Sequence, residues 1–346
     1  MISDSRFPST VLILGARGRL GLATAQAFAQ AGWRVLGQLR PGASGKALPG
    51  VQWLPLDPTD TAALAVAARG AAVVVHGLNP VYTHRAWRTQ VPVLLEAAIR
   101  ISRSLGATLM VPGNVYNFGA SMPALLREDT VQAAVGVKGR IRIAMEQRLQ
   151  AATQEGGLRA VVVRAGDFYG SGTGAWLDQA IAKDMALGRV TWPGTLDTIT
   201  PWAYLPDLAQ TFVQVAQQRN RLDTFSCLHF AGHAVTGQQW VQALSSVAQS
   251  QGWLPAGRSL QVRHMPWPLL RVAGLFMPML AALAEVRYLW RTPHQLDNRQ
   301  LCALIGNEPH TPFETAVRQA LHELGLLRAS ALPLAWAPAS NTTHAS

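Results

Sequence analysis

The stretch from Thr10 to Gly21, TVLILGARGRLG, decides the fold of this chain. A short apolar run ends at Gly15, glycines recur at Gly18 and Gly21, and a helical pattern follows. In such a strand, turn and helix, Gly15 can take the turn conformation, Gly18 lets a diphosphate approach the backbone, and Gly21 lets the helix lie close to the strand. The free amides and the positive end of the helix dipole then face the phosphates. The stretch therefore predicts a dinucleotide site.

The chain after this stretch alternates strand patterns with helix patterns. Strands are expected at 33–39, 51–56, 71–76, 107–111, 160–164 and 224–231, and helices at 61–68, 85–105, 137–153, 203–217 and 237–251. Such alternation is typical of parallel sheets with right-handed crossovers. We therefore expect an α/β fold with a Rossmann-type, doubly wound parallel sheet, whose ligands lie beyond the carboxyl ends of the strands.

A smaller C-terminal substrate domain is expected beside this sheet. The predicted boundaries give residues 1–172 and 198–235 to the dinucleotide domain, 173–197 and 236–328 to the substrate domain, and 329–346 to a disordered tail without periodicity. One apolar run, 272–284, has 13 residues and is too short to span a bilayer. It is expected to be a buried or interfacial helix, and a peripheral membrane contact stays open.

Composition excludes several classes of protein. Lys and Arg number 30 against 19 Asp and Glu, which gives a net charge of +11, but the arginines are scattered rather than clustered. The excess suits an anionic ligand and argues against nucleic acid as a partner. Two cysteines without metal-ligand spacing exclude a disulfide framework and favour a reducing compartment. We expect a cytoplasmic protein with a small-molecule substrate, no metal and no integral membrane segment; a homo-oligomer stays open.

The residue at the end of the second strand bears on the choice of cofactor. An acid there would bind both ribose hydroxyls of NAD, but the chain has Arg40, which can pair with the extra phosphate of NADP. NADP is therefore preferred to NAD, unless Arg40 is a solvated loop charge. The expected cofactor contacts follow the strands and are Gly15, Arg17, Gly18, Arg19, Leu20, Gly21, Arg40, Asp57, Pro58, Gly77, Leu78, Asn79, Lys138, Arg142 and Ala165.

With these loops in place, the chain resembles the short-chain dehydrogenase/reductase superfamily, in particular the extended type that includes nucleotide-sugar epimerases and dehydratases. The matching features span about residues 10 to 235. They are the three glycines, Asp57 after the third strand, Val115-Tyr116 after the fifth, 164–166 (RAG) and 169–170 (YG) after the sixth, and 204–207 (YLPD). The resemblance implies a nicotinamide cofactor and hydride chemistry.

That chemistry requires a tyrosine and a lysine at positions i and i+4 of the helix after the fifth strand. The tyrosine moves a proton, and the lysine binds the nicotinamide ribose and lowers the tyrosine pKa. Counting back from Glu146 puts Arg142 at the lysine position and Lys138 at the tyrosine position. The usual serine is also replaced, and Asn114 stands near its place, where it could bind a substrate carbonyl. The chain thus resembles an atypical member with a rewritten catalytic pair.

Three explanations of the missing tyrosine stay open. Lys138 could be the proton donor, with a pKa that falls toward neutrality beside Arg142. Tyr116 or Tyr169 could deliver the proton instead. Alternatively no hydride moves, and the protein binds NADP as a sensor or scaffold. We take Lys138, Arg142, Asn114 and Tyr116 as the catalytic candidates.

The expected activity is that of an NADP-dependent oxidoreductase on a small carbonyl or alcohol. A nucleotide-sugar epimerase or dehydratase is an alternative, placed lower because those reactions rely on the missing tyrosine. Structural roles are also open for single residues. Arg142 could form an ion pair with Glu146 four residues further on, and His76 could pack in the core without a chemical role. Asp167 could shape a loop or contact the substrate.

Overall fold

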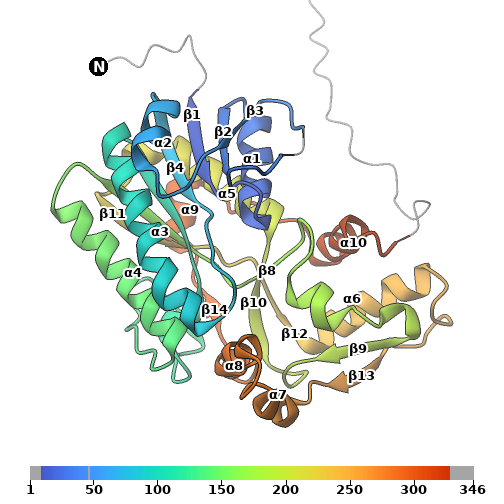
Figure 1. Ribbon diagram of the computed structural model, residues 1–346. Helices are drawn as coiled ribbons and strands as arrows, with labels where there is room; N and C mark the ends of the chain where they lie inside the picture. The colour runs from blue at the N-terminus through green and yellow to red at the C-terminus, as the bar shows by residue number, and fades with distance from the viewer. Residues whose placement is uncertain (1–8, 46, 328–346) are drawn as a thin grey trace, which may run out of the picture.

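A seven-stranded parallel sheet forms the centre of the computed structural model, which describes residues 9–45 and 47–327 (Figure 1). The predicted disordered tail lies outside these residues. The strand order is β11-β7-β5-β4-β1-β2-β3, and every neighbouring pair is parallel. The strands are β1 (Thr10–Leu14), β2 (Arg34–Leu39), β3 (Val51–Pro55), β4 (Ala71–His76), β5 (Thr108–Gly113), β7 (Arg159–Arg164) and β11 (Phe225–His229). This confirms the predicted Rossmann-type sheet.

Helices cover both faces of this sheet, so its central strands are apolar on both sides. One face packs against α1 (Arg19–Gln30) and α5 (Leu205–Gln217), with α9 (Arg299–Ile305) beside α5. The other face packs against α2 (Thr61–Ala67), α3 (His84–Leu105) and α4 (Val137–Gln154). Alternate residues of β1 enter the two cores: Val11 and Ile13 lie in the first, and Leu12 and Leu14 in the second. The sheet is therefore doubly wound, as predicted.

A second, tryptophan-rich core lies outside the seven-stranded sheet, and its strands and helices occupy mainly the lower part of Figure 1. Its three-stranded sheet joins β8 (Asp167–Tyr169), β10 (Ile199–Tyr204) and β12 (His233–Thr236), and two short pairs join β9 (Arg189–Trp192) to β13 (Gln261–His264) and β6 (Leu125–Leu126) to β14 (Gln295–Leu296). The helices around it are α6 (Gly237–Ser250), α7 (Trp267–Ala273), α8 (Pro278–Glu285) and α10 (Phe313–Glu323). The short helical turns are η1 (Val115–Phe118), η2 (Leu177–Ile181), η3 (Met185–Leu187), η4 (Arg219–Arg221) and η5 (Val286–Trp290).

This core draws on both predicted domains. Trp202 of β10 and Val235 of β12 belong to the predicted dinucleotide domain, but both pack in the tryptophan-rich core with Trp192 and Trp240. The predicted boundaries at 172, 198 and 235 stay a prediction.

Two predicted helices differ from the structure. The helix expected at 203–217 begins at Leu205, because the preceding residues extend the second sheet as β10 and Pro206 occupies the first helical turn. The apolar run 272–284 is divided between α7 and α8 by a turn. Its Leu275 and Phe276 are 80% and 84% exposed, so the buried-helix interpretation is wrong and the interfacial one remains. Among helices of the described chain, none has the length and apolarity that a membrane span requires.

Candidate functional site

The glycine stretch forms the tight turn between β1 and α1. Gly15 has a φ of 72°, which favours glycine, and its carbonyl accepts a hydrogen bond from the Gly18 amide at 2.9 Å. A Cβ on Gly21 would lie 2.3 Å from the Gly15 carbonyl oxygen. The Gly77 amide donates to the Leu14 carbonyl at 2.9 Å, which holds the loop after β4 against this turn. The turn and the close helix approach thus require Gly15 and Gly21; the role of Gly18 toward a diphosphate stays a prediction.

Gln38 stabilises this turn by a hydrogen bond. In the sequence it is notable only because the second strand ends without an acidic residue. It is buried at the end of β2. Its Oε1 accepts a hydrogen bond from the Gly15 amide at 2.9 Å, and its Nε2 donates to the Leu56 carbonyl at 2.7 Å. Gln38 therefore links the first three strands beneath the glycine turn. A polar residue inside an apolar strand was the available signal, because a buried amide needs partners.

The basic residues around the turn take different positions. Arg19 donates from Nη2 to the Gly170 carbonyl at 2.7 Å, and its buried Nε has no hydrogen-bond partner among the residues described. Arg17 and Arg40 are exposed. Arg19 therefore connects α1 to the loop after β8, whereas Arg17 and Arg40 stay accessible to an anionic ligand.

Other predicted cofactor residues divide into loop and core positions. Leu20 and Ala165 are buried in the core beneath the turn, so only their backbone can reach a ligand. Asp57 accepts hydrogen bonds from the amide and the hydroxyl of Thr59, which lower its pKa. Pro58 and Leu78 are half-buried, Asn79 is exposed, and Leu78 lies against the position of Gly15. Asp57 therefore shapes its own loop.

Lys138 is buried in the first turn of α4 and points toward α8. Its Nζ donates to the Ala282 carbonyl at 2.6 Å and lies 3.9 Å from the centre of the Tyr82 ring. Its backbone amide donates to Glu285 at 2.9 Å. Burial lowers the pKa of Lys138 to about 8, against the opposing charge of Glu285. The lowered pKa that the first explanation requires thus comes from burial and not from Arg142, and the role of Lys138 as proton donor stays a prediction.

Arg142 lies one helical turn further along α4. Its Nη1 donates to the Pro112 carbonyl at 3.3 Å, and its guanidinium lies 5.1 Å from the centre of the Trp87 ring. Its buried Nε has no hydrogen-bond partner in the described part of the chain. The alternative that Arg142 pairs with Glu146 is wrong: Glu146 pairs with Arg164 at 2.7 Å, because the fully buried Arg164 needs a carboxylate.

Three of the five tyrosines of the chain gather beside these two cations. The hydroxyls of Tyr116 and Tyr82 are 3.1 Å apart, and the Tyr288 hydroxyl donates to the Tyr116 carbonyl at 3.4 Å. Burial raises the pKa of all three tyrosines. Sequence reasoning missed Tyr82 and Tyr288. Tyr82 could have been found from its place just after the loop that follows β4, but nothing in the sequence connects Tyr288 to this site.

Asn114 and Tyr169 form hydrogen bonds in different parts of the structure. The Asn114 Oδ1 accepts a hydrogen bond from the Tyr116 amide at 3.0 Å and caps η1; the contact of Asn114 with a substrate carbonyl stays a prediction. The Tyr169 hydroxyl lies 2.9 Å from His233 Nδ1 inside the tryptophan-rich core. Tyr169 therefore does not join Lys138, and Tyr116 remains the tyrosine candidate.

Two further titratable groups adjoin the tyrosines. Asp167 at the start of β8 has its pKa raised to about 7 by burial, and its charge in turn raises the pKa of Tyr82, Tyr116 and Tyr288. His76 at the end of β4 is buried, and burial together with Arg142 lowers its pKa to about 4. His76 is therefore neutral at physiological pH, as a packed histidine would be.

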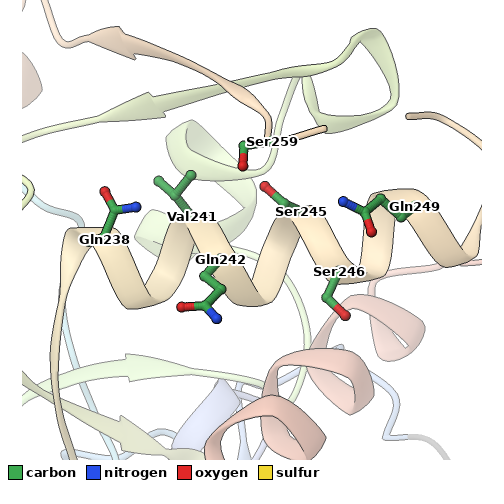
Figure 2. Close-up of a pocket in the computed structure, with 7 residues that line it drawn as sticks. All are labelled: Gln238, Val241, Gln242, Ser245, Ser246, Gln249 and Ser259. Atoms are coloured by element: carbon green, nitrogen blue, oxygen red, sulfur yellow. The ribbon is translucent and has the colours of Figure 1, made fainter. Parts of the chain in front are cut away.

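A separate hollow lies along α6 (Figure 2). It has a volume of about 370 Å³ and is lined by amides, hydroxyls and one apolar side chain: Gln238, Val241, Gln242, Ser245, Ser246, Gln249 and Ser259. It contains none of the predicted site residues. In the described part of the chain, no group of three His, Cys, Asp or Glu residues could hold a metal ion.

The residues at the carboxyl edge of the sheet fit a nicotinamide dinucleotide. The glycine turn leaves no room for side chains at Gly15 and Gly21, and the amino end of α1 opens beside it. Arg19 and Arg142 each keep a buried guanidinium Nε without a protein partner among the described residues. Fold and site together define a Rossmann-type protein with a cationic, tyrosine-lined site at the usual edge of its sheet.

Comparison with known proteins gives the family. The model of the NAD dependent epimerase/dehydratase family matches residues 11–226, so the chain belongs to that family. No curated protein matches the sequence.

Solved structures with the same fold cover almost the whole chain. UDP-glucose 4-epimerase from Brucella ovis in complex with NAD has a TM-score of 0.70 at 17% identity, over 92% of this chain and 99% of that one. The Bordetella bronchiseptica enzyme WbmH in complex with NAD+ has a TM-score of 0.68 at 16% identity, over 92% and 98%. UDP-glucose 4-epimerase from Thermotoga maritima with UDP-glucose has a TM-score of 0.69 at 14% identity, over 91% and 98%. At these identities the likeness shows the fold.

Proposed function

We propose that this chain is a nicotinamide-dinucleotide-dependent enzyme of the epimerase/dehydratase type, acting by hydride transfer on a nucleotide sugar. The observation that carries the proposal is a cluster beyond the ends of β4 and β5: Tyr82 contacts both Lys138 and Tyr116, and Trp87 lies against both Arg142 and Tyr116. The family match and the structures of epimerases with NAD or UDP-glucose support it. They favour this activity over the oxidoreductase activity on a small carbonyl or alcohol that the sequence predicts.

The bound dinucleotide would accept or supply a hydride at its nicotinamide ring. The chain itself has to move the matching proton. With a pKa of about 8, Lys138 can take the proton from a sugar hydroxyl as the carbonyl forms and return it in the reverse step. Tyr116 has a pKa raised well above its usual value and is the second candidate. Arg142 supplies positive charge near Tyr116, which opposes the raised pKa of that tyrosine.

For the cofactor we propose NADP rather than NAD. Arg40 is exposed just after β2, where it can meet the extra phosphate, and no acid competes with it at that strand end. Four of the similar structures contain NAD, so calorimetry with NADPH and NADH decides. NADPH should bind more tightly, and Arg40→Ala should weaken NADPH by roughly tenfold or more while leaving NADH unchanged. Equal affinities in the wild type would remove the role of Arg40.

The second candidate function is a non-catalytic dinucleotide sensor. It is favoured by one observation: the Lys138 ammonium already donates to the Ala282 carbonyl and lies against Tyr82. A lysine held in this way can serve to fasten α4 to α8. The protein would then bind the dinucleotide without turnover.

One experiment separates the two functions. The protein is incubated with UDP-glucose or UDP-galactose and either oxidised dinucleotide, and product is followed by NMR. Lys138→Met should lower turnover by about 10²-fold or more, whereas Arg140→Met, an exposed cation two residues away, should not. A loss in Tyr116→Phe but not in Lys138→Met would assign the proton to Tyr116. Dinucleotide binding without product from these or related nucleotide sugars would favour the sensor.

A further inference from the structure

The two short helices α7 and α8 form a hairpin, residues 267–285, whose outer side is apolar. Figure 1 shows both helices together at the lower edge of the molecule. The turn between them carries Leu275 and Phe276, 80% and 84% exposed. The other exposed apolar side chains of the hairpin are Leu269, Val272, Met277 and Met279. An exposed apolar cluster of this kind marks an interaction site.

The inner side of the hairpin is firmly attached to the protein. The Trp267 indole donates to the Pro193 carbonyl at 2.6 Å, and the carbonyl of the buried Ala282 accepts the Lys138 ammonium at 2.6 Å. Glu285 accepts the Lys138 amide and pairs with His84. The exposed outer side therefore belongs to a fixed element.

The charge at the border of the hairpin is positive. Arg271 and Arg291 are exposed, and the guanidinium of Arg287 lies 5.6 Å from the centre of the Trp267 ring, with a buried Nε that lacks a partner in the described chain. Burial, and then the charges of Arg291 and Arg271, lower the pKa of Arg287. Glu285, the one acid between residues 265 and 291, is turned inward. The border thus offers three cations to an anionic partner.

These features select among three possible occupants. A second copy related by a twofold axis would bring the same three arginines against themselves, which like-charge repulsion opposes. A protein partner would need acids placed around a pocket for Phe276. An anionic bilayer needs no shaped pocket: Leu275, Phe276 and Met277 can enter the headgroup and acyl boundary while the arginines meet lipid phosphates.

We propose that the α7–α8 hairpin docks this protein on the surface of an anionic lipid bilayer. The exposed turn at 275–277 supplies the apolar contact, and Arg271, Arg287 and Arg291 supply the electrostatic one. The contact is peripheral and reversible. The residues that would contact the bilayer are not among those of the proposed function, although the inner side of the hairpin contacts Lys138.

Sedimentation with vesicles tests this proposal. The full chain is mixed with vesicles of phosphatidylcholine alone or with about one third phosphatidylglycerol, a fraction we choose to resemble an anionic leaflet. The wild type should bind the mixed vesicles at least tenfold more tightly than the neutral ones, and added salt should weaken the binding. Leu275→Ser with Phe276→Ser should lower the affinity at least tenfold, and Arg271→Glu should reduce the preference for anionic lipid.

Val66→Ser serves as the matched control, because Val66 is 67% exposed on α2, away from the hairpin, and this variant should bind as the wild type does. Circular dichroism verifies that each variant is folded. Two results would overturn the proposal: equal sedimentation with and without vesicles, or equal binding by the wild type and the Leu275/Phe276 variant. Self-association of the wild type that this variant abolishes, without vesicle binding, would assign the hairpin to a second copy instead.

Discussion

At the scale of single residues, Lys138 is the position on which the chemistry depends. Its ammonium is removed from water, stacked on Tyr82 and bonded to one carbonyl, and the lost hydration lowers its pKa to about 8. A tyrosine at this position would need a nearby lysine to reach a similar pKa. Burial alone brings the lysine into the same range.

This pKa predicts the pH profile of turnover. In the half-reaction that reduces the carbonyl, Lys138 must donate a proton, so the rate of that step should fall as pH rises through about 8; in the half-reaction that oxidises the alcohol it must be neutral, and the rate of that step should rise through the same pH. Single-turnover formation and consumption of the reduced dinucleotide from pH 6 to 10, a range chosen around the usual lysine and histidine values, measure the two steps separately. If Tyr116 were the donor, no inflection near pH 8 would appear.

The raised pKa of Asp167 predicts how the free energy of unfolding changes with pH. Its folded pKa of about 7 lies above the unfolded value of 3.8, so the folded state binds more protons between these values and loses stability as pH rises through them. Asp167→Asn removes the buried charge. It should unfold in urea with the same free energy as the wild type near pH 4 and be more stable by about 1 to 4 kcal/mol near pH 8. A wild-type to variant difference independent of pH would contradict the shift.

At the scale of elements, the approach of α1 to β1 gives the next prediction. Alanine normally stabilises a helix relative to glycine by about 1 kcal/mol, but a Cβ on Gly21 would lie 2.3 Å from the Gly15 carbonyl oxygen. Gly21→Ala should therefore destabilise the fold by about 1 to 3 kcal/mol and weaken dinucleotide binding. Gln26→Ala, an exposed change on the same helix, is the control for urea unfolding. A stabilised Gly21→Ala would show that α1 can move away.

The elements that sequence predicted well are those with a strong local pattern. The strand at 71–76 has β-branched residues on both faces and appears with the predicted bounds, and the helix at 137–153 differs by one residue at its end. The strand at 199–204 was not predicted, because it is stabilised by the packing of Trp202 in the tryptophan-rich core. Such a tertiary contact leaves no periodic pattern in the local sequence. For the run 272–284 the buried interpretation is wrong because an apolar run does not show which of its side chains pack.

The same division holds for the site. The need for glycine at Gly15 and Gly21 could be predicted because the turn geometry is local. The neighbouring positions of Lys138 and Arg142 could be predicted because they share one face of one helix, but their chemical roles stay predictions. Tyr288, Ala282 and Glu285 could not, since they reach the site from more than 100 residues away. Nothing in the sequence indicates that Glu146 forms its ion pair with Arg164 and not with Arg142.

At the scale of the whole molecule, acidic side chains fasten the C-terminal segment across both cores. Asp207 of α5 accepts the amide and the hydroxyl of Thr311 at 2.7 and 2.8 Å. Glu323 of α10 accepts the Ser171 amide at 2.7 Å. Each bond joins positions more than 100 residues apart. The segment before α10 therefore ties the Rossmann-type sheet to the tryptophan-rich core.

The carboxylate of Glu308 lies at the centre of this connection between the two cores. It accepts the amides of Ala231 and Gly232, which join β11 of one sheet to β12 of the other, at 2.8 Å each, and the Asn298 amide group at 2.9 Å. Glu308→Ala leaves these donors unpaired, so it should lower the free energy of unfolding by about 2 to 4 kcal/mol. Glu314→Ala, an exposed acid in the first turn of α10, should cost less than about 1 kcal/mol. Urea unfolding followed by tryptophan fluorescence measures both, and equal losses would show that Glu308 does not join the two cores.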